Sequence, residues 1–232
     1  MQSREAGHIR MNPPYYSSRR YYLNQLRKQI EFAISHYVKD RELNTLLDYG
    51  SGNSPYKPLF IQHVADYQSA DLAENPVATL HLNQDGGLTG HNGEFDIVLS
   101  TQVLEHVYHP PFYLSECHRL MKKDGLLILS THGYWMYHPD PTDFWRWTSS
   151  GLKKIIGEAG FEIISFRGII GRNAMGLQLF QDGFLFKIPR FLRPVWSVFM
   201  QFFISIVNLM NSKKAIDQDA CTYVVVAKPK NQ

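Results

Sequence analysis

A chain of 232 residues with 44% hydrophobic side chains has the size and apolar content of one α/β domain with additions. The net charge of +3 is too small to indicate nucleic-acid binding, and two cysteines exclude a disulfide framework or a Cys-x-x-Cys zinc site. No metal ligands are predicted. The polar first twelve residues show no apolar signal segment, so we expect a cytoplasmic protein, with membrane association left open by a later segment.

The chain begins with a predicted arm and helix, 1–44, in which apolar residues recur at helical spacing over 20–38. Strand and helix patterns then alternate through a core, 45–169, before an apolar insertion, 170–220, and a last strand with its tail, 221–232. Short continuous apolar strands separated by helices are typical of a parallel sheet covered on both faces. Strands are expected at 45–48, 67–71, 78–82, 95–100, 126–131, 161–166 and 221–227, and further helices at 110–121 and 149–159.

The turn after the first strand is the most informative segment, because Gly50 and Gly52 follow Asp48 at once. Glycine lacks a Cβ, so the backbone there can turn tightly and approach a ligand closely. Pro55 stands where a dinucleotide-binding fingerprint would have its third glycine, which disfavours a nicotinamide dehydrogenase. An ordinary strand-to-helix turn is the alternative interpretation.

Two further acids lie beyond strand ends, where ligands bind in such sheets. Asp71 ends the second strand and can accept hydrogen bonds from ribose hydroxyls, although a surface-turn role is equally compatible with its position. Asp85, followed by Gly86, lies beyond the third strand, where an acceptor can bind an adenine amino group. A simple acid in a glycine-rich turn explains that pair as well.

Several motifs together resemble one family. Asp48-x-Gly50-x-Gly52-x-x-Pro55 resembles motif I of the class I S-adenosylmethionine (SAM) methyltransferases. Residues 95–107, Phe-Asp-Ile-Val-Leu-Ser-Thr-Gln-Val-Leu-Glu-His-Val, resemble the strand and turn of the type-11, ubiquinone-biosynthesis-like branch, and the helix and turn at 116–125 resemble its following motif. Asp124 replaces the first glycine of that turn. The resemblance covers residues 45 to about 170 and the final strand.

This resemblance implies a Rossmann-like, doubly wound, seven-stranded mixed sheet with an antiparallel last strand, and SAM as cofactor. It implies that the glycine turn holds the methionine part of SAM above Asp48, and that Asp71 binds the ribose. It further implies that Asp85 and Gly86 border the adenine, and that Gln102 lies near the emerging methyl group. Glu105 and His106 are adjacent in sequence, so they point about 100° apart on a helix and are not expected to share a ligand. The resemblance implies that they pack the turn.

The segment 131–148 follows the fifth strand on the ligand side and is rich in His, Tyr and Trp. Its His138-x-x-Pro141-x-Asp143-x-x-Arg146 pattern resembles a sub-branch of type-11 methyltransferases, several of which act in polysaccharide or glycolipid pathways. A histidine titrates near neutrality and can take a hydroxyl proton. The candidate catalytic residues are therefore His132, His138 and Asp143, with a structural Asp143–Arg146 ion pair as the alternative.

The insertion contains an uncharged stretch, 195–210, which is short for a helix that spans a bilayer. Residues 184–210 are expected to form a lid, a homodimer contact or a peripheral membrane contact. The function that the resemblance implies is SAM-dependent methyl transfer to a small-molecule, sugar or lipid-linked acceptor, first of all at oxygen. A carbon acceptor on a quinone-like lipid and a catalytically silent SAM-binding or interaction subunit remain as alternatives.

Overall fold

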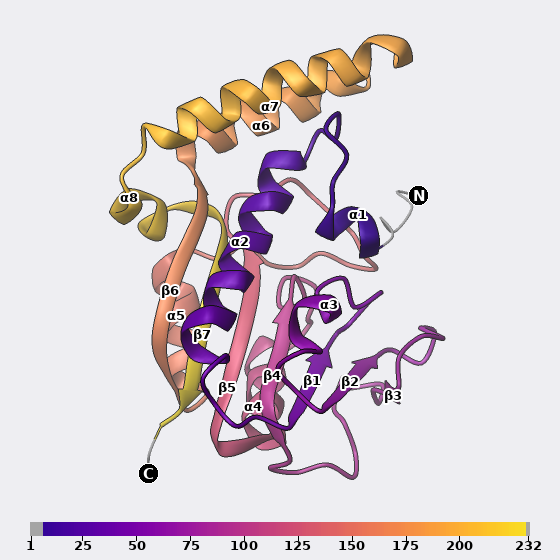
Figure 1. Cartoon of the computed structure of the whole chain (residues 1–232), viewed down its shortest axis with the longest axis vertical. Coiled ribbons are helices and arrows are strands. Elements are labelled where there is room, and N and C mark those ends of the chain that lie inside the picture. Colours follow the sequence, from indigo (N-terminus) through magenta and orange to yellow (C-terminus); the bar gives the residue numbers. More distant parts are fainter. Residues whose placement is uncertain (1–6, 231–232) are drawn as a thin grey trace.

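Seven strands form one mixed sheet in the order β3-β2-β1-β4-β5-β7-β6 (Figure 1). The computed structural model describes residues 7–230. Strands β1 to β5 pair in parallel, and β7 runs antiparallel to both β5 and β6, so the predicted Rossmann-like fold is confirmed. The strands are β1 (Thr45–Tyr49), β2 (Asp66–Asp71), β3 (Leu80–His81), β4 (Phe95–Thr101), β5 (Met121–His132), β6 (Phe161–Gly171) and β7 (Ala220–Pro229).

Apolar side chains alternate between the two faces of the sheet, as the pleat of a strand requires. Leu46 belongs to one buried cluster and its neighbour Leu47 to the other. Helix α2 (Arg20–Tyr37) covers the first cluster with its apolar stripe. Helices α4 (Pro110–Leu120) and α5 (Ser149–Glu158) cover the second. The sheet is therefore buried on both sides, which explains the continuous apolar strands of the sequence.

The helix starts follow from local sequence. Thr148 is the N-cap of α5, and its side chain accepts a hydrogen bond from the amide of Gly151 at 3.0 Å. Pro110 opens α4, where a missing N–H costs no helical hydrogen bond. Two short helices, α1 (Gly7–Met11) and α3 (Lys57–Phe60), had no clear periodic signal because each spans little more than one turn.

Two predicted boundaries differ from the structure. The strand expected at 78–82 contains only two paired residues, Leu80 and His81. Thr79 also bonds to Ser69, through both its backbone amide and its side chain, but it lies outside the regular ladder. The turn expected after α4 lies inside β5. Phe95 pairs with Met121 but Ile97 pairs with Leu126, so residues 122–125 leave the ladder as an irregularity.

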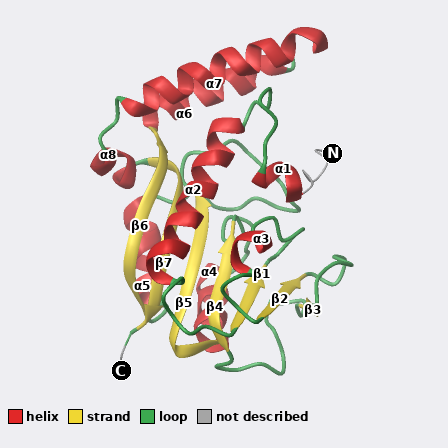
Figure 2. Ribbon diagram, in the orientation of Figure 1, coloured by secondary structure: helices red, strands yellow, loops and turns green. Residues whose placement is uncertain are grey.

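The insertion between β6 and β7 is helical. It contains α6 (Arg172–Leu185), the 3-10 turn η1 (Arg190–Leu192), α7 (Arg193–Leu209) and α8 (Lys213–Gln218). Figure 2 shows α6 and α7 lying side by side across one end of the molecule, beyond the strands. The parallel strands run toward that same end, so their carboxyl ends face the helical pair (Figure 1).

Candidate active site

The turn after β1 requires glycine. Gly50 has φ +81°, and a Cβ on it would lie 2.7 Å from both Cγ atoms of Val103. The amides of Gly50 and Ser51 donate to the carbonyl of Ala70 at 2.8 and 3.1 Å, which fixes the turn against the end of β2. Gly52 has open space where its Cβ would be, and it lines a large cavity. The turn therefore leaves room for a ligand at this end of the sheet.

Asp71 ends β2 and holds the glycine turn. Its Oδ2 atom accepts hydrogen bonds from the amide of Gly52 at 2.8 Å and from the side chain of Asn75 at 2.6 Å. Its Oδ1 atom accepts from the amide of Leu72 at 2.8 Å. A carboxylate has about four acceptor positions, so one remains for a ligand hydroxyl. Asp71 lines the cavity, as its predicted role requires.

Asp48 lies beneath the turn and is not among the residues that line the cavity. It is buried, and its Oδ2 atom accepts a hydrogen bond from the hydroxyl of Tyr67 at 2.6 Å. Burial raises the pKa of Asp48 to about 6, against the opposing effect of that hydrogen bond. This position matches the predicted place at the base of the loop, but it gives Asp48 a supporting role rather than a ligand contact.

Asp85 and Gly86 follow β3 in a tight turn and both line the cavity. The amide of Gly87 donates to Oδ1 of Asp85 at 2.9 Å. The hydroxyl of Tyr49, at the end of β1, donates to the carbonyl of Gly86. This bond ties the turn to the sheet. Because the amide of Gly87 occupies only Oδ1 of Asp85, the second carboxylate oxygen can accept a hydrogen bond from a ligand amino group.

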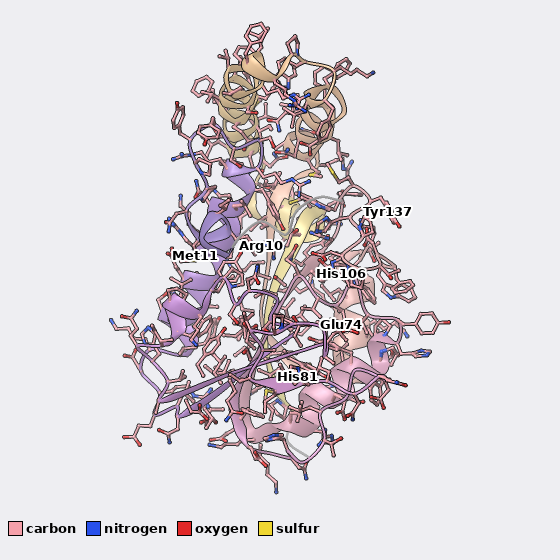
Figure 3. All side chains as sticks on the ribbon, turned by 90° about the vertical axis from the view of Figure 1, so that its right-hand side faces the viewer. Arg10, Met11, Glu74, His81, His106 and Tyr137 are labelled. Atoms are coloured by element: carbon pink, nitrogen blue, oxygen red, sulfur yellow. The ribbon has the colours of Figure 1, made fainter. Side chains whose placement is uncertain are left out.

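One cavity of about 1190 Å³ connects these residues with the loop after β5. Ligand pockets of roughly 300–1,000 Å³ hold single small molecules, so this space is large enough for a nucleoside-containing cofactor and a second ligand. Figure 3 shows Arg10 and His106, which both line the cavity, between the helical pair and the strand ends. The predicted site residues that line it are Gly50, Gly52, Asp71, Asp85, Gly86, Gln102, His132 and His138.

The residues present fit SAM. Gly52 leaves open space beside the turn, and carboxylate acceptors at Asp71 and Asp85 lie at the ends of neighbouring strands. A ribose presents hydroxyl donors and an adenine presents an amino donor, so the cavity offers complementary acceptors to both. Val103 and Phe112 add apolar surface to the same lining.

Gln102 follows β4 with φ +57°, a conformation that is uncommon for a residue other than glycine. Its amide bonds to the carbonyl of Ser130 at 2.9 Å, and its side chain donates to the hydroxyl of the same residue at 3.1 Å. The side-chain oxygen accepts from the hydroxyl of Tyr22 at 2.8 Å. These bonds fix Gln102 in the lining of the cavity and connect α2 to the carboxyl end of β5.

His132 ends β5 beside a buried acid. Its Nδ1 atom lies 3.0 Å from Oε1 of Glu105, and the two residues are 2% and 0% exposed. The hydroxyl of Thr131 donates to the other carboxylate oxygen at 2.8 Å. Burial opposes ionisation of Glu105, but the adjacent His132 outweighs it and lowers the pKa of the carboxyl to about 2. The imidazole also stacks on Trp135, with ring centres 5.0 Å apart.

His138 lies in the same part of the cavity. Its ring centre is 6.2 Å from that of His132 and 5.7 Å from that of His106. Burial, and then the neighbouring His132 and Arg19, lower the pKa of His138 to about 4. The imidazole is therefore neutral at neutral pH, and it can accept hydrogen bonds there.

Asp143 is not among the residues that line the cavity. It pairs with Arg146 at 2.5 Å and accepts a hydrogen bond from the amide of His138 at 2.7 Å. Burial acts against ionisation, but the bonds from Arg146 and His138 hold the pKa of Asp143 below its ordinary value. The structure thus shows Asp143 in the ion pair with Arg146 that was the alternative to a catalytic role. The carboxylate lies behind His138, which forms this part of the cavity wall.

Sequence reasoning did not identify the partner of His132. Glu105 was expected to pack its turn, and its backbone carbonyl does accept bonds from the amides of Phe144 and Trp145. Its side chain, however, faces His132 across two adjacent strand ends. An acid within the apolar run of Val103 and Leu104 was the available signal, since a buried carboxylate needs a partner. Among residues 7–230, no cluster of three His, Cys, Asp or Glu side chains suits a metal ion.

Several known proteins are similar to this chain. The ubiquinone biosynthesis O-methyltransferase of Cereibacter sphaeroides is 36% identical over 99 residues, which is 37% of this chain and 40% of that protein. The protein of the same name from Dinoroseobacter shibae is 29% identical over 157 residues, 54% of this chain and 62% of that one. The match therefore spans less than two thirds of these relatives.

Solved structures show the same fold at low identity. A chain of the complex between the Haloferax volcanii Trm112 methyltransferase activator and a methyltransferase of unassigned role gives a TM-score of 0.58. That match is 14% identical and covers 93% of this chain and 95% of that one. Haemonchus contortus phosphoethanolamine N-methyltransferase 2 with bound SAM gives 0.56, at 12% identity, over 99% and 61% of the two chains.

A family model described as a methyltransferase domain matches residues 18–165, more than half of the chain. That range includes the glycine turn, both carboxylates beyond the strand ends and the Glu105–His132 pair. The chain therefore belongs to the methyltransferase-domain family of class I SAM-dependent methyltransferases, enzymes whose cofactor is SAM.

Proposed function

We propose that this protein transfers a methyl group from SAM to an oxygen atom of a small-molecule, sugar or lipid-linked acceptor. The observation that carries this proposal is a single cavity that contains both the glycine turn with Asp71 and a histidine supported by a buried carboxylate. The names of the O-methyltransferase relatives support the same chemistry.

In this proposal the first half of the cavity binds the cofactor. The turn at Gly50 and Gly52 holds the amino-acid part, Asp71 accepts from the ribose, and Asp85 with Gly86 borders the adenine. When bound, SAM supplies a methyl group that its sulfonium makes reactive. The residues of this half bind and orient the cofactor, and they leave the chemistry of the acceptor to the loop after β5.

The second half of the cavity activates the acceptor. The carboxylate of Glu105 faces Nδ1 of His132 and favours the tautomer that carries its proton there, so Nε2 is left to accept a proton. As the acceptor oxygen bonds to the methyl carbon, the carbon–sulfur bond breaks and the hydroxyl proton passes to Nε2. A general base of this kind contributes roughly 100-fold to 10,000-fold in rate. Neutral His138 lies beside it and can hydrogen-bond the acceptor.

The remaining lining favours an acceptor with an apolar part. Side chains from α2, the loop after β5 and the end of α6 contribute Leu23, Leu26, Trp135, Met136 and Phe186 to the cavity. An aromatic or lipid-linked molecule would bury apolar surface there, at about 25 cal/mol per Å². Alignment of two bound reactants can itself account for several kcal/mol of the barrier. We place this activity in the cytoplasm.

The test is a methyl-transfer assay with labelled SAM and a panel of acceptors that differ in the reacting atom. The panel contains polyprenylated catechols, polyprenylated quinols with an open ring carbon, and lipid-linked sugars with free hydroxyls. The expected product is a methyl ether, and it should be almost lost with His132→Asn although SAM still binds. A carbon-methylated product would favour the quinone alternative. Binding of SAM without any product would favour a silent subunit and overturn the proposal.

A further inference from the structure

Helices α6 and α7 carry the broadest exposed apolar surface of the described chain. More than half of the exposed large hydrophobic side chains fall between Leu179 and Met210, and Phe191 and Leu209 are 79% and 81% exposed. A monomer rarely leaves such a contiguous surface in water unless something covers it. The exposed side chains of α7 are Val195, Val198, Phe199, Phe202, Phe203, Ile206 and Leu209.

These positions recur at intervals of three and four, so they form one stripe along the helix. The opposite stripe of α7 is buried and includes Met200, Gln201 and Ile204. Figure 1 shows α7 at the end of the molecule, with α6 and α2 on its inner side. The exposed stripe therefore faces away from the sheet and has no partner within the described residues.

The inner stripe of α7 is tied to the rest of the chain by hydrogen bonds. The side-chain nitrogen of Gln201 donates to the carbonyl of Ser18 and to the amide oxygens of Gln178 and Gln181, at 2.8 to 2.9 Å. Its oxygen accepts from the amide of Tyr21 at 2.7 Å. Within the described chain, the stretch Arg190–Leu209 has the length and mean hydropathy, 1.3, of a spanning helix. Spanning would strip Gln201 of its partners in hydrocarbon, so α7 is suited to lie on a bilayer instead.

The charges in the segment that carries this stripe, residues 183–216, have one sign. Residues 183–216 contain no Asp or Glu. Lys187, Arg190 and Arg193 precede the apolar stripe, and Lys213 and Lys214 follow it. An apolar helix face with cations at both ends is complementary to a bilayer that carries anionic headgroups, where each cation contributes about 1 kcal/mol.

We propose that the α6–α7 face docks flat on an anionic lipid bilayer and places the mouth of the cavity at the membrane surface. Leu185 and Phe186, at the end of α6, belong both to the cavity lining and to this end of the helical pair. A lipid-linked acceptor would then reach the cavity without leaving the membrane. This last step rests on the proposed function, whereas the docking itself does not.

A second copy of this chain fits the same face less well. In a two-fold dimer each residue meets the symmetry-related surface, so antiparallel α7 helices would bring Lys187 and Arg190 of one copy near Lys213 and Lys214 of the other. Residues 183–216 contain no acid to compensate this repulsion, and Asp217 and Asp219 beyond them already bond to the amide of Gly168 and to Arg172. Like charges held together across an interface cost several kcal/mol, so the charge pattern favours lipid.

The test is flotation of the full chain with vesicles of phosphatidylcholine alone and of phosphatidylcholine mixed with phosphatidylglycerol. The protein should float with the mixed vesicles, and high salt should release it. Lys187→Glu with Arg190→Glu should weaken binding by roughly 1,000-fold, because two attractions become repulsions. Phe199→Ser with Phe202→Ser should also abolish flotation. The matched control is Lys39→Glu with Lys123→Glu, which reverses two exposed charges far from the helical pair and should leave flotation unchanged.

Light scattering after sizing chromatography distinguishes the alternative. A stable dimer that ignores both vesicle types would overturn the proposal, and so would a monomer that ignores them. Calorimetry with SAM keeps the two proposals separate, since the Phe199 and Phe202 side chains lie outside the cavity lining. Loss of flotation in the phenylalanine variant with intact SAM binding would support docking through this face. Intact flotation without methyl transfer would leave docking supported and contradict only the proposed function.

Discussion

Glu105 and His132 form a buried pair, with Oε1 of the acid 3.0 Å from Nδ1 of the imidazole. The acid follows β4 and the histidine ends β5, so two adjacent parallel strands bring them together. The hydroxyl of Thr131 fixes the second carboxylate oxygen. Burying a carboxylate costs free energy unless a nearby partner compensates its charge. Here that partner, His132, also lines the cavity.

Glu105→Gln should lower the turnover of methyl transfer by about 100-fold or more while SAM affinity stays close to that of the wild type. The amide has the shape of the carboxylate but no charge, so it no longer selects the His132 tautomer with a free Nε2. Single-turnover rates and SAM calorimetry measure the two effects separately. The pH dependence of the rate should change as well, which a purely structural defect would not cause.

The control is Glu162→Gln, which neutralises an exposed acid paired with Lys228 on the sheet edge and should leave the rate unchanged. If Glu105 and His132 act as a unit, the double variant with His132→Asn should be no slower than His132→Asn alone. Fully multiplicative losses would show that the two side chains act independently.

Gly50→Ala should destabilise the fold and weaken SAM binding, whereas Gly52→Ala should mainly weaken binding. A Cβ on Gly50 meets Val103 at 2.7 Å, but a Cβ on Gly52 meets only open space in the cavity. Both glycines have positive φ, so alanine costs each about 1–2 kcal/mol of strain, and Gly50 has the collision in addition. Urea denaturation and calorimetry compare the two variants directly.

Val103→Ala provides the rescue for this pair. It removes both methyl groups that Gly50→Ala would touch, so the double variant should recover part of the lost stability. The same rescue should have no effect on Gly52→Ala. If Gly50→Ala is as stable as Gly52→Ala in the urea experiment, the packing against Val103 is not what requires glycine.

Asp143→Asn should raise the KM for the acceptor and lower thermal stability, with the Kd for SAM unchanged. The substitution weakens the pair with Arg146 and the anchor of the His138 amide, so the loop that presents His138 becomes less ordered. Breaking a partly buried pair of this kind costs about 1–3 kcal/mol. Glu158→Gln, which breaks the exposed pair with Lys154, is the matched control and should cost less than roughly 1 kcal/mol. A rise in the Kd for SAM would contradict this separation of the two halves.

The succession of strands and helices along the chain, the glycine turn and the acids beyond strand ends were predictable, because each depends on residues close in sequence. Gly50, Asp71 and Asp85 lie where the strand pattern placed them, and all three line one cavity. The antiparallel last strand followed from the resemblance alone, because strand direction leaves no mark on the pattern of Ala220–Pro229.

The pairings across long sequence separations could not be predicted. Gln201 lies in the uncharged stretch 195–210, whose sequence gives no sign of its partners. Its four hydrogen bonds join α7 to α6 and to the segment around Ser18. The contact between Glu105 and His132, 27 positions apart, left no mark on either local pattern. One sequence shows which residues can pair, whereas the fold decides which of them meet.

Asp48→Asn should stabilise the protein at neutral pH and much less at acid pH. Burial raises the pKa of Asp48 to about 6, so the folded state holds its proton more tightly than the unfolded chain does. The wild-type protein therefore has its full stability below about pH 4, where Asp48 is protonated in both the folded and the unfolded state. This stability falls as the pH rises through 6 and the buried carboxyl ionises. A shift of about two pKa units corresponds to roughly 3 kcal/mol at neutral pH, a cost that the asparagine avoids. The side-chain oxygen of the asparagine would still accept the hydrogen bond that Tyr67 donates to Asp48.

Urea denaturation across this pH range should show the stability difference between the Asp48→Asn variant and the wild type growing with pH. The control, Asp124→Asn at an exposed position, should follow the wild type. A difference that is constant with pH would show that the carboxyl of Asp48 does not titrate in this window.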